Sequence, residues 1–295
     1  MKKRFLSLLA LAAFALCAVV CLPSCGNQAK TSDDSGFKPD PAYATIDKLA
    51  DFLITDQQEP ATLEEITKHV EAQTLALKSY WHLNHKGEDA AKADETACQD
   101  LSVLADSLEG GSTMDMVRCG QIRCAIDSYF TAKEYSEKYN DNKLYQNEMQ
   151  QWLALESQLK EFYGDLAQVA NWGGTIVQVN TASAFVGLAH DRLFDYAELH
   201  KGGSFASSEM PLTEARTQLI HELEDAKSVD DAMVDEPEFK KTVQGLRACA
   251  DRIVTLLDNW LTARTELCKS EGIPETHTAH FIEKTARRIL EMIEG

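Results

Sequence analysis

Apolar residues recur every three or four positions along most of this chain, and that spacing constrains its fold more than any other feature. The two most regular stripes are Trp152, Leu155, Leu159, Phe162, Leu166 and Val169, and Phe239, Val243, Leu246, Ala250, Ile253, Leu257 and Trp260. Residues at this spacing lie on one face of an α-helix, and long helices that carry such stripes pack antiparallel at shallow angles. The sequence therefore predicts an all-α protein, an elongated antiparallel helical bundle of about eight or nine helices with no sheet.

Helix start and stop signals divide the chain into segments. Asp40-Pro41 supplies an N-cap and a first-turn proline, and Thr62-Leu63-Glu64-Glu65 is a capping box. Gly110-Gly111 and Gly202-Gly203 are stop signals, and prolines 211, 237 and 274 stand where new helices begin. The predicted helices span 41–56, 62–85, 88–109, 113–139, 142–170, 176–200, 211–228, 237–270 and 274–293.

The first 24 residues have the pattern of a signal peptide. Lys2, Lys3 and Arg4 precede an apolar run from Phe5 to Leu22 that is too short for a membrane span. The run ends in Leu22-Pro23-Ser24-Cys25-Gly26, which resembles a bacterial lipobox, so Cys25 is the predicted lipidated N-terminus of the mature protein. Cys21 is a competing site, and an uncleaved or ordinary secretory signal is the alternative to lipidation.

Residues 25–40 form the predicted tether between the lipid and the folded body. This segment is polar and too poor in apolar residues to bury a core. Asp33 and Asp34 resemble the acidic tract that sends some Bacteroidota lipoproteins to the cell surface, although an ordinary polar linker has the same composition. The expected location is the bacterial cell envelope, on the periplasmic or surface face of the outer membrane, and the expected contact with the membrane is through the lipid anchor.

The charge balance is strongly acidic. The chain has 29 Lys and Arg against 47 Asp and Glu, a net charge of −18. Removal of the signal takes away three basic residues and no acidic one, which leaves −21. Nucleic acid is excluded as an expected partner, because its phosphates require a basic surface. Such a body attracts basic proteins at rates that fall with salt, unless the charge serves solubility alone.

One helix resembles a known family. Trp260-Leu261-Thr262-Ala263-Arg264-Thr265-Glu266-Leu267-Cys268 resembles the W-x-x-x-R-x-x-x-C helix of the lysozyme-inhibitor-like (LprI-type) domain. The later landmarks of that family, a Gly-Gly-Ser/Thr loop and a helix with an arginine, resemble Trp172-Gly173-Gly174-Thr175-Ile176 and Arg192, which follow a second tryptophan helix at Trp152. The resemblance implies two divergent copies, in 112–203 and 204–295, behind N-terminal helices in 41–111.

The two copies depart from the family pattern. The first has Glu156 where arginine is usual, and the second lacks the glycine loop and the partner cysteine before its last helix. A chance match to a helical hairpin is the competing explanation. The resemblance implies a non-catalytic protein that binds and blocks lysozyme.

The landmark residues also have a physical interpretation. Trp260, Arg264 and Cys268 lie on one stripe of a helix, so a buried Arg264 must reach a carboxylate or a carbonyl group, and the same holds for Arg192. Both arginines are expected to join helices. The loop of Trp172, Gly173, Gly174 and Thr175 is either a contact point for a partner or a simple turn with an inward tryptophan.

Five cysteines lie beyond the signal and lipid positions: Cys98, Cys119, Cys124, Cys249 and Cys268. Outside the cytoplasm such thiols oxidise, so disulfides between helices are expected, with at least one cysteine unpaired because the number is odd.

Motifs of enzyme active sites are lacking. The sequence has no H-E-x-x-H, no G-x-S-x-G and no phosphate-binding glycine loop. Two H-x-x-H pairs, His82/His85 and His277/His280, have a spacing at which zinc can bind, but histidines near helix ends are more often solvated. No metal or other cofactor is therefore predicted. The leading hypothesis is a binding protein for a basic partner such as lysozyme, followed by a scaffolding envelope lipoprotein and then by a metal-dependent hydrolase.

Overall fold

The computed structural model of the chain describes residues 37–55, 62–85, 89–172, 174, 176–201, 208–229 and 235–294, except for the side chains of 138 and 196–201. Residues 38–295 form one compact unit. The described segments are helices and turns without a strand, so the predicted all-α bundle is confirmed. None of the described helices combines the length and apolar character needed to cross a bilayer.

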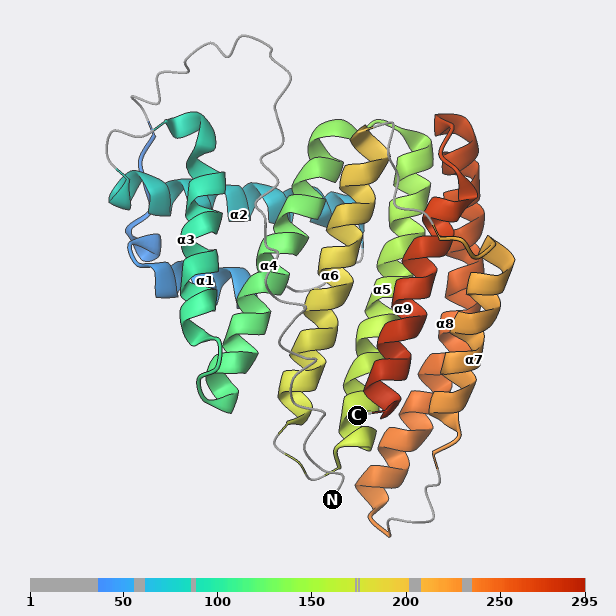
Figure 1. The fold of residues 1–295 in the computed structure, drawn as a ribbon. Coiled ribbons are helices and arrows are strands. Elements are labelled where there is room, and N and C mark those ends of the chain that lie inside the picture. The colour runs from blue at the N-terminus through green and yellow to red at the C-terminus, as the bar shows by residue number, and fades with distance from the viewer. Residues whose placement is uncertain are drawn as a thin grey trace. The chain divides into compact units, whose positions relative to one another are not determined.

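The N-terminal part contains four α-helices and two short 3-10 helices (Figure 1). In chain order they are η1 (Pro41–Tyr43), α1 (Ile46–Thr55), α2 (Leu63–Asn84), η2 (Ala90–Lys92), α3 (Ala93–Leu108) and α4 (Thr113–Lys138).

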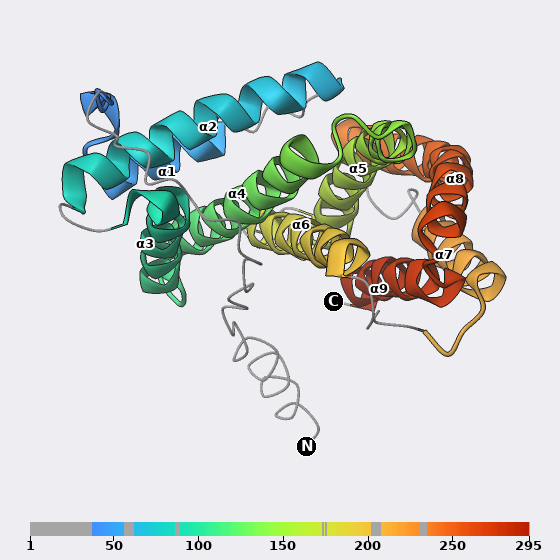
Figure 2. The same cartoon turned by 90° about the horizontal axis from the view of Figure 1, so that it is seen from above.

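Five α-helices follow in the described C-terminal part. They are α5 (Lys143–Ala170), α6 (Val177–Lys201), α7 (Leu212–Lys227), α8 (Pro237–Glu271) and α9 (Glu275–Glu294). The most extensive helix pairs are α5 with α8, α4 with α6, and α7 with α9, and Figure 2 shows α6 beside both α4 and α5.

Local capping explains where these helices begin and end. Thr62 accepts from the Glu65 amide while the Glu65 carboxylate accepts from the Thr62 amide, which confirms the predicted capping box. Ser112 and Asp115 form a second box at α4. The chain leaves α8 at Gly272, whose φ of +70° is a left-handed conformation that glycine adopts without strain.

Two predicted helices begin differently from the expectation. The segment predicted as one helix over 41–56 is a 3-10 turn followed by α1, and the segment over 88–109 is η2 followed by α3. In both cases an aspartate caps the short turn, Asp40 on the Ala42 amide and Asp89 on the Ala91 amide. A side chain that binds the amide two residues on favours a tight turn at the expense of a regular α-helical start.

Two hydrophobic cores hold the unit together. The smaller core is formed by α1, α2, α3 and the first part of α4. The larger core is centred on α5, α7, α8 and α9, and it contains every residue of the two apolar stripes. Those stripe residues are all buried, as predicted.

The larger core draws on both predicted copies, because α5 of the first copy lies along α8 of the second. The packing of helices within this unit does not test the predicted domain boundaries at 111/112 and 203/204, which stay predictions. Between the two cores, α4 and α6 approach closely at Gly120, where a Cβ atom would lie 3.1 Å from the Ala182 Cβ.

Candidate functional site

Four charged side chains meet inside the larger core, next to Trp152 and Trp260. Arg192 of α6 binds Glu148 of α5 through both terminal nitrogens, at 2.7 and 3.0 Å, and its Nη1 lies 2.8 Å from Asp195 Oδ2. Arg264 of α8 lies 2.5 Å from Asp195 Oδ1 and 3.5 Å from Glu148 Oε1. We call these four residues the buried ion cluster. Its two cations and two anions balance in charge and link α5, α6 and α8.

Helix α9 contributes two further polar groups. His277 Nε2 lies 3.0 Å from Asp195 Oδ1, and the Thr278 hydroxyl accepts from Arg264 Nε at 3.4 Å. Each of the charged side chains in the cluster and His277 is at most 4% exposed as a residue. The cluster is therefore shielded from water and bonded to all four helices around it.

Three aromatic rings cover one side of the buried ion cluster. Trp152, Trp260 and Phe281 have ring centroids 5.3 to 5.7 Å apart in edge-on or tilted arrangements. Trp260 also donates its indole N–H to Glu148 Oε1 at 2.7 Å. The guanidinium of Arg192 lies 4.6 Å from the Trp152 ring centre. These contacts combine ion pairing with cation–π attraction in a dry environment.

The electrostatics of the cluster favour its charged form. Burial raises the pKa of Asp195, but Arg264, His277 and Arg192 outweigh burial, and together they hold that pKa well below the usual range. Burial lowers the pKa of Arg264, but Asp195 and Glu148 outweigh it and raise that pKa. Asp195 and Arg264 are therefore both charged at neutral pH.

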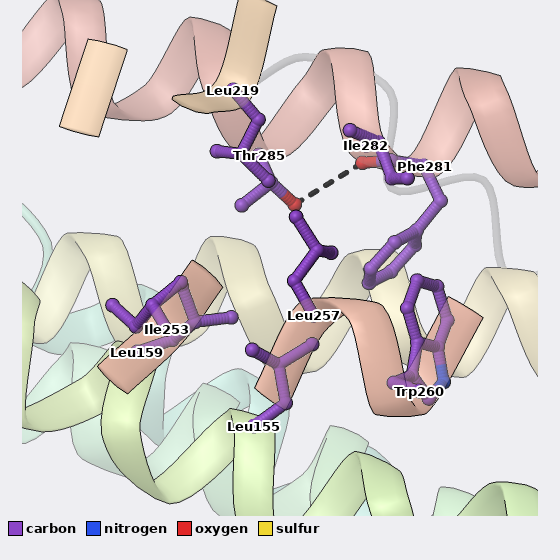
Figure 3. A pocket seen from close by; sticks show the side chains of 9 residues that line it. All are labelled: Leu155, Leu159, Leu219, Ile253, Leu257, Trp260, Phe281, Ile282 and Thr285. Atoms are coloured by element: carbon purple, nitrogen blue, oxygen red, sulfur yellow. Dashed lines mark hydrogen bonds between the residues drawn. The ribbon is translucent and has the colours of Figure 1, made fainter. Parts of the chain in front are cut away.

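A small apolar pocket lies beside the aromatic rings (Figure 3). Its volume is about 10 Å³, close to that of a single water-sized probe. Its lining residues are Leu155, Leu159, Leu219, Ile253, Leu257, Trp260, Phe281, Ile282 and Thr285. The Thr285 hydroxyl points back to the Phe281 carbonyl oxygen, at 3.1 Å. This space is a packing defect in an apolar core and has no room for a substrate.

The structure places the predicted landmark residues in two separate regions. Trp152, Arg192, Trp260 and Arg264 come together in and around the buried ion cluster, and the Cys268 thiol lies next to it, 3.7 Å from the Thr278 hydroxyl. The helix-joining role expected for both arginines is what their contacts show. The anionic partners of the two arginines were not predicted from the sequence, although Glu148 lies four residues before Trp152, on its apolar stripe.

The predicted tryptophan loop lies far from that cluster. Trp172 lies two residues past the end of α5, and Trp152 lies 18 residues, about 27 Å, before that end. Its indole N–H donates to Glu236 Oε2 at 3.0 Å, and its ring packs edge-on against Phe239 at 4.9 Å. The Gly174 amide donates to the Asn171 carbonyl oxygen at 2.7 Å. Gly173 and Thr175 lie outside the described residues, as does the predicted lipidation site at Cys25.

The expected disulfides are not formed. Cys98, Cys119, Cys124, Cys249 and Cys268 are all free and buried thiols. The expectation was wrong because the thiols are dispersed in the packed interior: Cys98 and Cys119 lie in the smaller core, Cys249 and Cys268 lie in the larger core, and Cys124 lies 3.9 Å from the Phe185 carbonyl oxygen. Burial also raises the pKa of Cys124 to about 11, which keeps the reactive thiolate form rare.

The histidines that had a metal-type spacing have other contacts. His85 Nε2 lies 2.7 Å from Asp100, which also accepts from the Tyr80 hydroxyl. His277 faces the buried ion cluster. Glu283, three residues beyond His280 and so a further possible metal ligand, accepts from the Ser208 hydroxyl. Across the described part of the chain, no group of three or more metal-binding side chains converges.

Comparisons of the chain with protein-family models, curated proteins and solved structures found no match.

Proposed function

We propose that this protein is a membrane-anchored, non-enzymatic lipoprotein of the bacterial envelope that binds a basic protein such as lysozyme and blocks it. The observation that carries the proposal is the distribution of charge. Residues 41–111 contain 14 Asp and Glu against five Lys and no Arg. This segment forms η1 to α3, so a large share of the acidic excess gathers on a few adjoining helices.

The two arginines buried in the larger core do not reduce the negative charge that is exposed at the surface. Arg192 and Arg264 are sealed inside, where Glu148 and Asp195 neutralise them. The charges that a partner meets are therefore mainly acidic. Such a surface steers a basic protein toward the body and repels anionic ones.

Lysozyme is the proposed partner because of the resemblance to the LprI-type domain. The proposed contact point is the turn that contains Trp172, whose ring is half-buried and held between the end of α5 and the start of α8. A large aromatic that is already fixed in place costs little ordering entropy on binding, which suits an interface anchor.

The test is an inhibition and binding assay with the folded body. Residues 38–295 form one compact unit with both hydrophobic cores, so this fragment is suitable. We expect it to slow a basic lysozyme, with affinity that falls steeply as salt rises, because counter-ions screen the attraction.

Charge reversals test the steering. Glu71→Lys with Glu95→Lys changes two exposed positions on α2 and α3, and Glu214→Lys with Glu291→Lys makes the same change on α7 and α9. The first pair should slow association with the basic partner more than the second, because it lies in the more acidic segment 41–111. If the body neither binds nor inhibits lysozyme at low salt, the inhibitor proposal fails, and a scaffolding lipoprotein becomes the better description.

A further inference from the structure

Helix α6 contains a long uncharged segment in a chain that is otherwise rich in charge. Charged residues make up 26% of the sequence, yet none occurs between Asp165 and Asp191. Most of α6 falls within this interval. In Figure 1 this helix, drawn in yellow, lies at the front of the molecule between α4 and α9.

One line of residues along α6 faces solvent. Ile176 and Phe194 are 18 residues apart, which is five helical turns, so they share one azimuth about 27 Å apart. Ile176 is in register because its carbonyl oxygen accepts the Asn180 amide. Between them the same line carries Asn180, Ser183, Gly187 and His190, and we call these six residues the α6 stripe. All six are exposed or half-buried.

The ends of the α6 stripe are apolar and open. Ile176 and Phe194 are each 42% exposed, and they are two of six large hydrophobic side chains that are exposed among the described residues. Both lie on one line of one helix, which distinguishes them from scattered surface hydrophobics.

The charged groups that flank the α6 stripe have partners of their own. Asp191 binds Arg288 at 2.6 Å and Lys284 at 3.2 Å, both from α9. On the other side, Asp127 of α4 lies 3.2 Å from the His190 ring. The Arg288 guanidinium lies against Gly187, where a Cβ atom would be 2.6 Å from Arg288 Nε, so Gly187 leaves the room that the Arg288–Asp191 pair occupies.

The order of residues in the α6 stripe is nearly symmetric about its centre. Read in either direction, it runs from a large apolar residue to a polar side chain and then to a small residue. In a two-fold dimer, residue i of one copy contacts residue j of the other, and the reverse contact also forms. Two antiparallel α6 helices would thus place Ile176 on Phe194 of the second copy and Asn180 opposite its His190.

We propose that the α6 stripe is a self-association surface, on which a second copy of this chain docks with its α6 antiparallel. Charge selects this occupant. Each chain carries −18, so two copies repel each other across most of their surfaces, and an uncharged stripe with paired flanks is where they can approach. This proposal is independent of lysozyme binding.

Sedimentation velocity of residues 38–295 over a range of concentrations tests the surface. We expect a monomer–dimer equilibrium that strengthens with added salt, because screening reduces the repulsion between acidic bodies. Binding of a basic partner has the opposite salt dependence, so the failure of one proposal is distinguishable from the failure of the other. A body that stays monomeric at every concentration and salt level overturns self-association.

A matched pair of variants locates the contact. Phe194→Glu should raise the dimer dissociation constant at least about tenfold, because each copy then buries an unpaired carboxylate against Ile176 of the other. Val103→Glu adds the same charge to α3, at a side chain that is 64% exposed, and should leave the constant within about twofold. Equal effects of the two variants place the interface elsewhere and overturn the assignment to α6.

Cysteine cross-linking tests the orientation. Ile176→Cys and Phe194→Cys are prepared as separate variants, and each is oxidised alone and after mixing. The antiparallel arrangement predicts cross-linked dimers in the mixture and few in either variant alone. Cross-links that form equally well in the separate variants show a parallel or non-specific contact and contradict the proposed arrangement.

Discussion

Arg192 of α6 and Glu148 of α5 form a two-point ion pair inside the bundle, with N–O distances of 2.7 and 3.0 Å and almost no exposure to water. Glu148 also accepts from Trp260 and lies 3.5 Å from Arg264, so one carboxylate links three helices. The buried ion cluster therefore acts as a cross-link of the core, and the loss of one member should lower the free energy of unfolding.

Arg192→Met should lower the free energy of unfolding by about 3–5 kcal/mol, because it leaves Glu148 buried without its main partner. The matched control is Arg216→Met, which breaks a two-point pair with Asp258 that is about a third to a half exposed. That change should cost less than about 1 kcal/mol. Urea unfolding measures both, and equal losses would show that burial adds nothing to the Arg192 pair.

The low pKa of Asp195 predicts where acid acts on the folded protein. Burial raises this pKa, but Arg264, His277 and Arg192 lower it further than burial raises it. The folded state therefore binds its proton at lower pH than the unfolded state, where aspartate has a pKa of about 3.9. The contribution of Asp195 to stability should be complete above that pH and fall progressively below it.

NMR titration of the Asp195 carboxyl carbon checks this expectation without a destabilising substitution. Its chemical shift should stay that of a carboxylate until the protein unfolds in acid. The exposed carboxyl of Asp258 serves as a comparison within the same sample. An Asp195 midpoint at or above about 4 would contradict the expected sign of the shift.

The five buried thiols should resist labelling in the native state. Burial raises the pKa of Cys249 to about 12, with a further increase from Glu161, and raises the pKa of Cys98, Cys119 and Cys268 as well. Because a thiol reagent reacts with the thiolate, residues 38–295 should release almost no chromophore from such a reagent until denaturant is added, and then about five equivalents. Fewer equivalents after denaturation, restored by a reductant, would show that disulfides form after all.

Lipidation is tested at the predicted mature N-terminus. Cys25→Ser should abolish incorporation of labelled fatty acid and release the protein into soluble fractions, because the anchor rather than the acidic body holds it at the membrane. Cys21→Ser is the matched control and should leave both properties unchanged. Labelling that persists in the first variant and is lost in the second would move the lipid to Cys21.

Substitutions of Trp172 distinguish a role in binding a partner from a role in packing. Trp172→Ala removes both the contact with Phe239 and the hydrogen bond to Glu236, so it should cost about 2 kcal/mol of stability. Trp172→Phe keeps most of the packing and should cost about 1 kcal/mol. If the ring anchors lysozyme, the alanine variant should also weaken inhibition by about 2 kcal/mol under conditions where it is fully folded. Unchanged inhibition by that folded variant would make Trp172 a purely structural residue.

The sequence by itself determined the helices, because helix formation depends on contacts within a few residues. The stripe from Trp152 to Val169 and the signals at Thr62 and Pro237 act over one turn or less, and the structure places helix ends close to where they predict them. The sequence also predicted that a buried Arg264 must reach a carboxylate or a carbonyl group. Only the tertiary structure decided that its partners are Asp195 and Glu148, which lie 69 and 116 residues away. The same holds for the contact of Trp172 with Glu236 and for the unpaired state of the cysteines. Which faces meet across a bundle depends on the packing of whole helices against one another, and no local pattern encodes that choice.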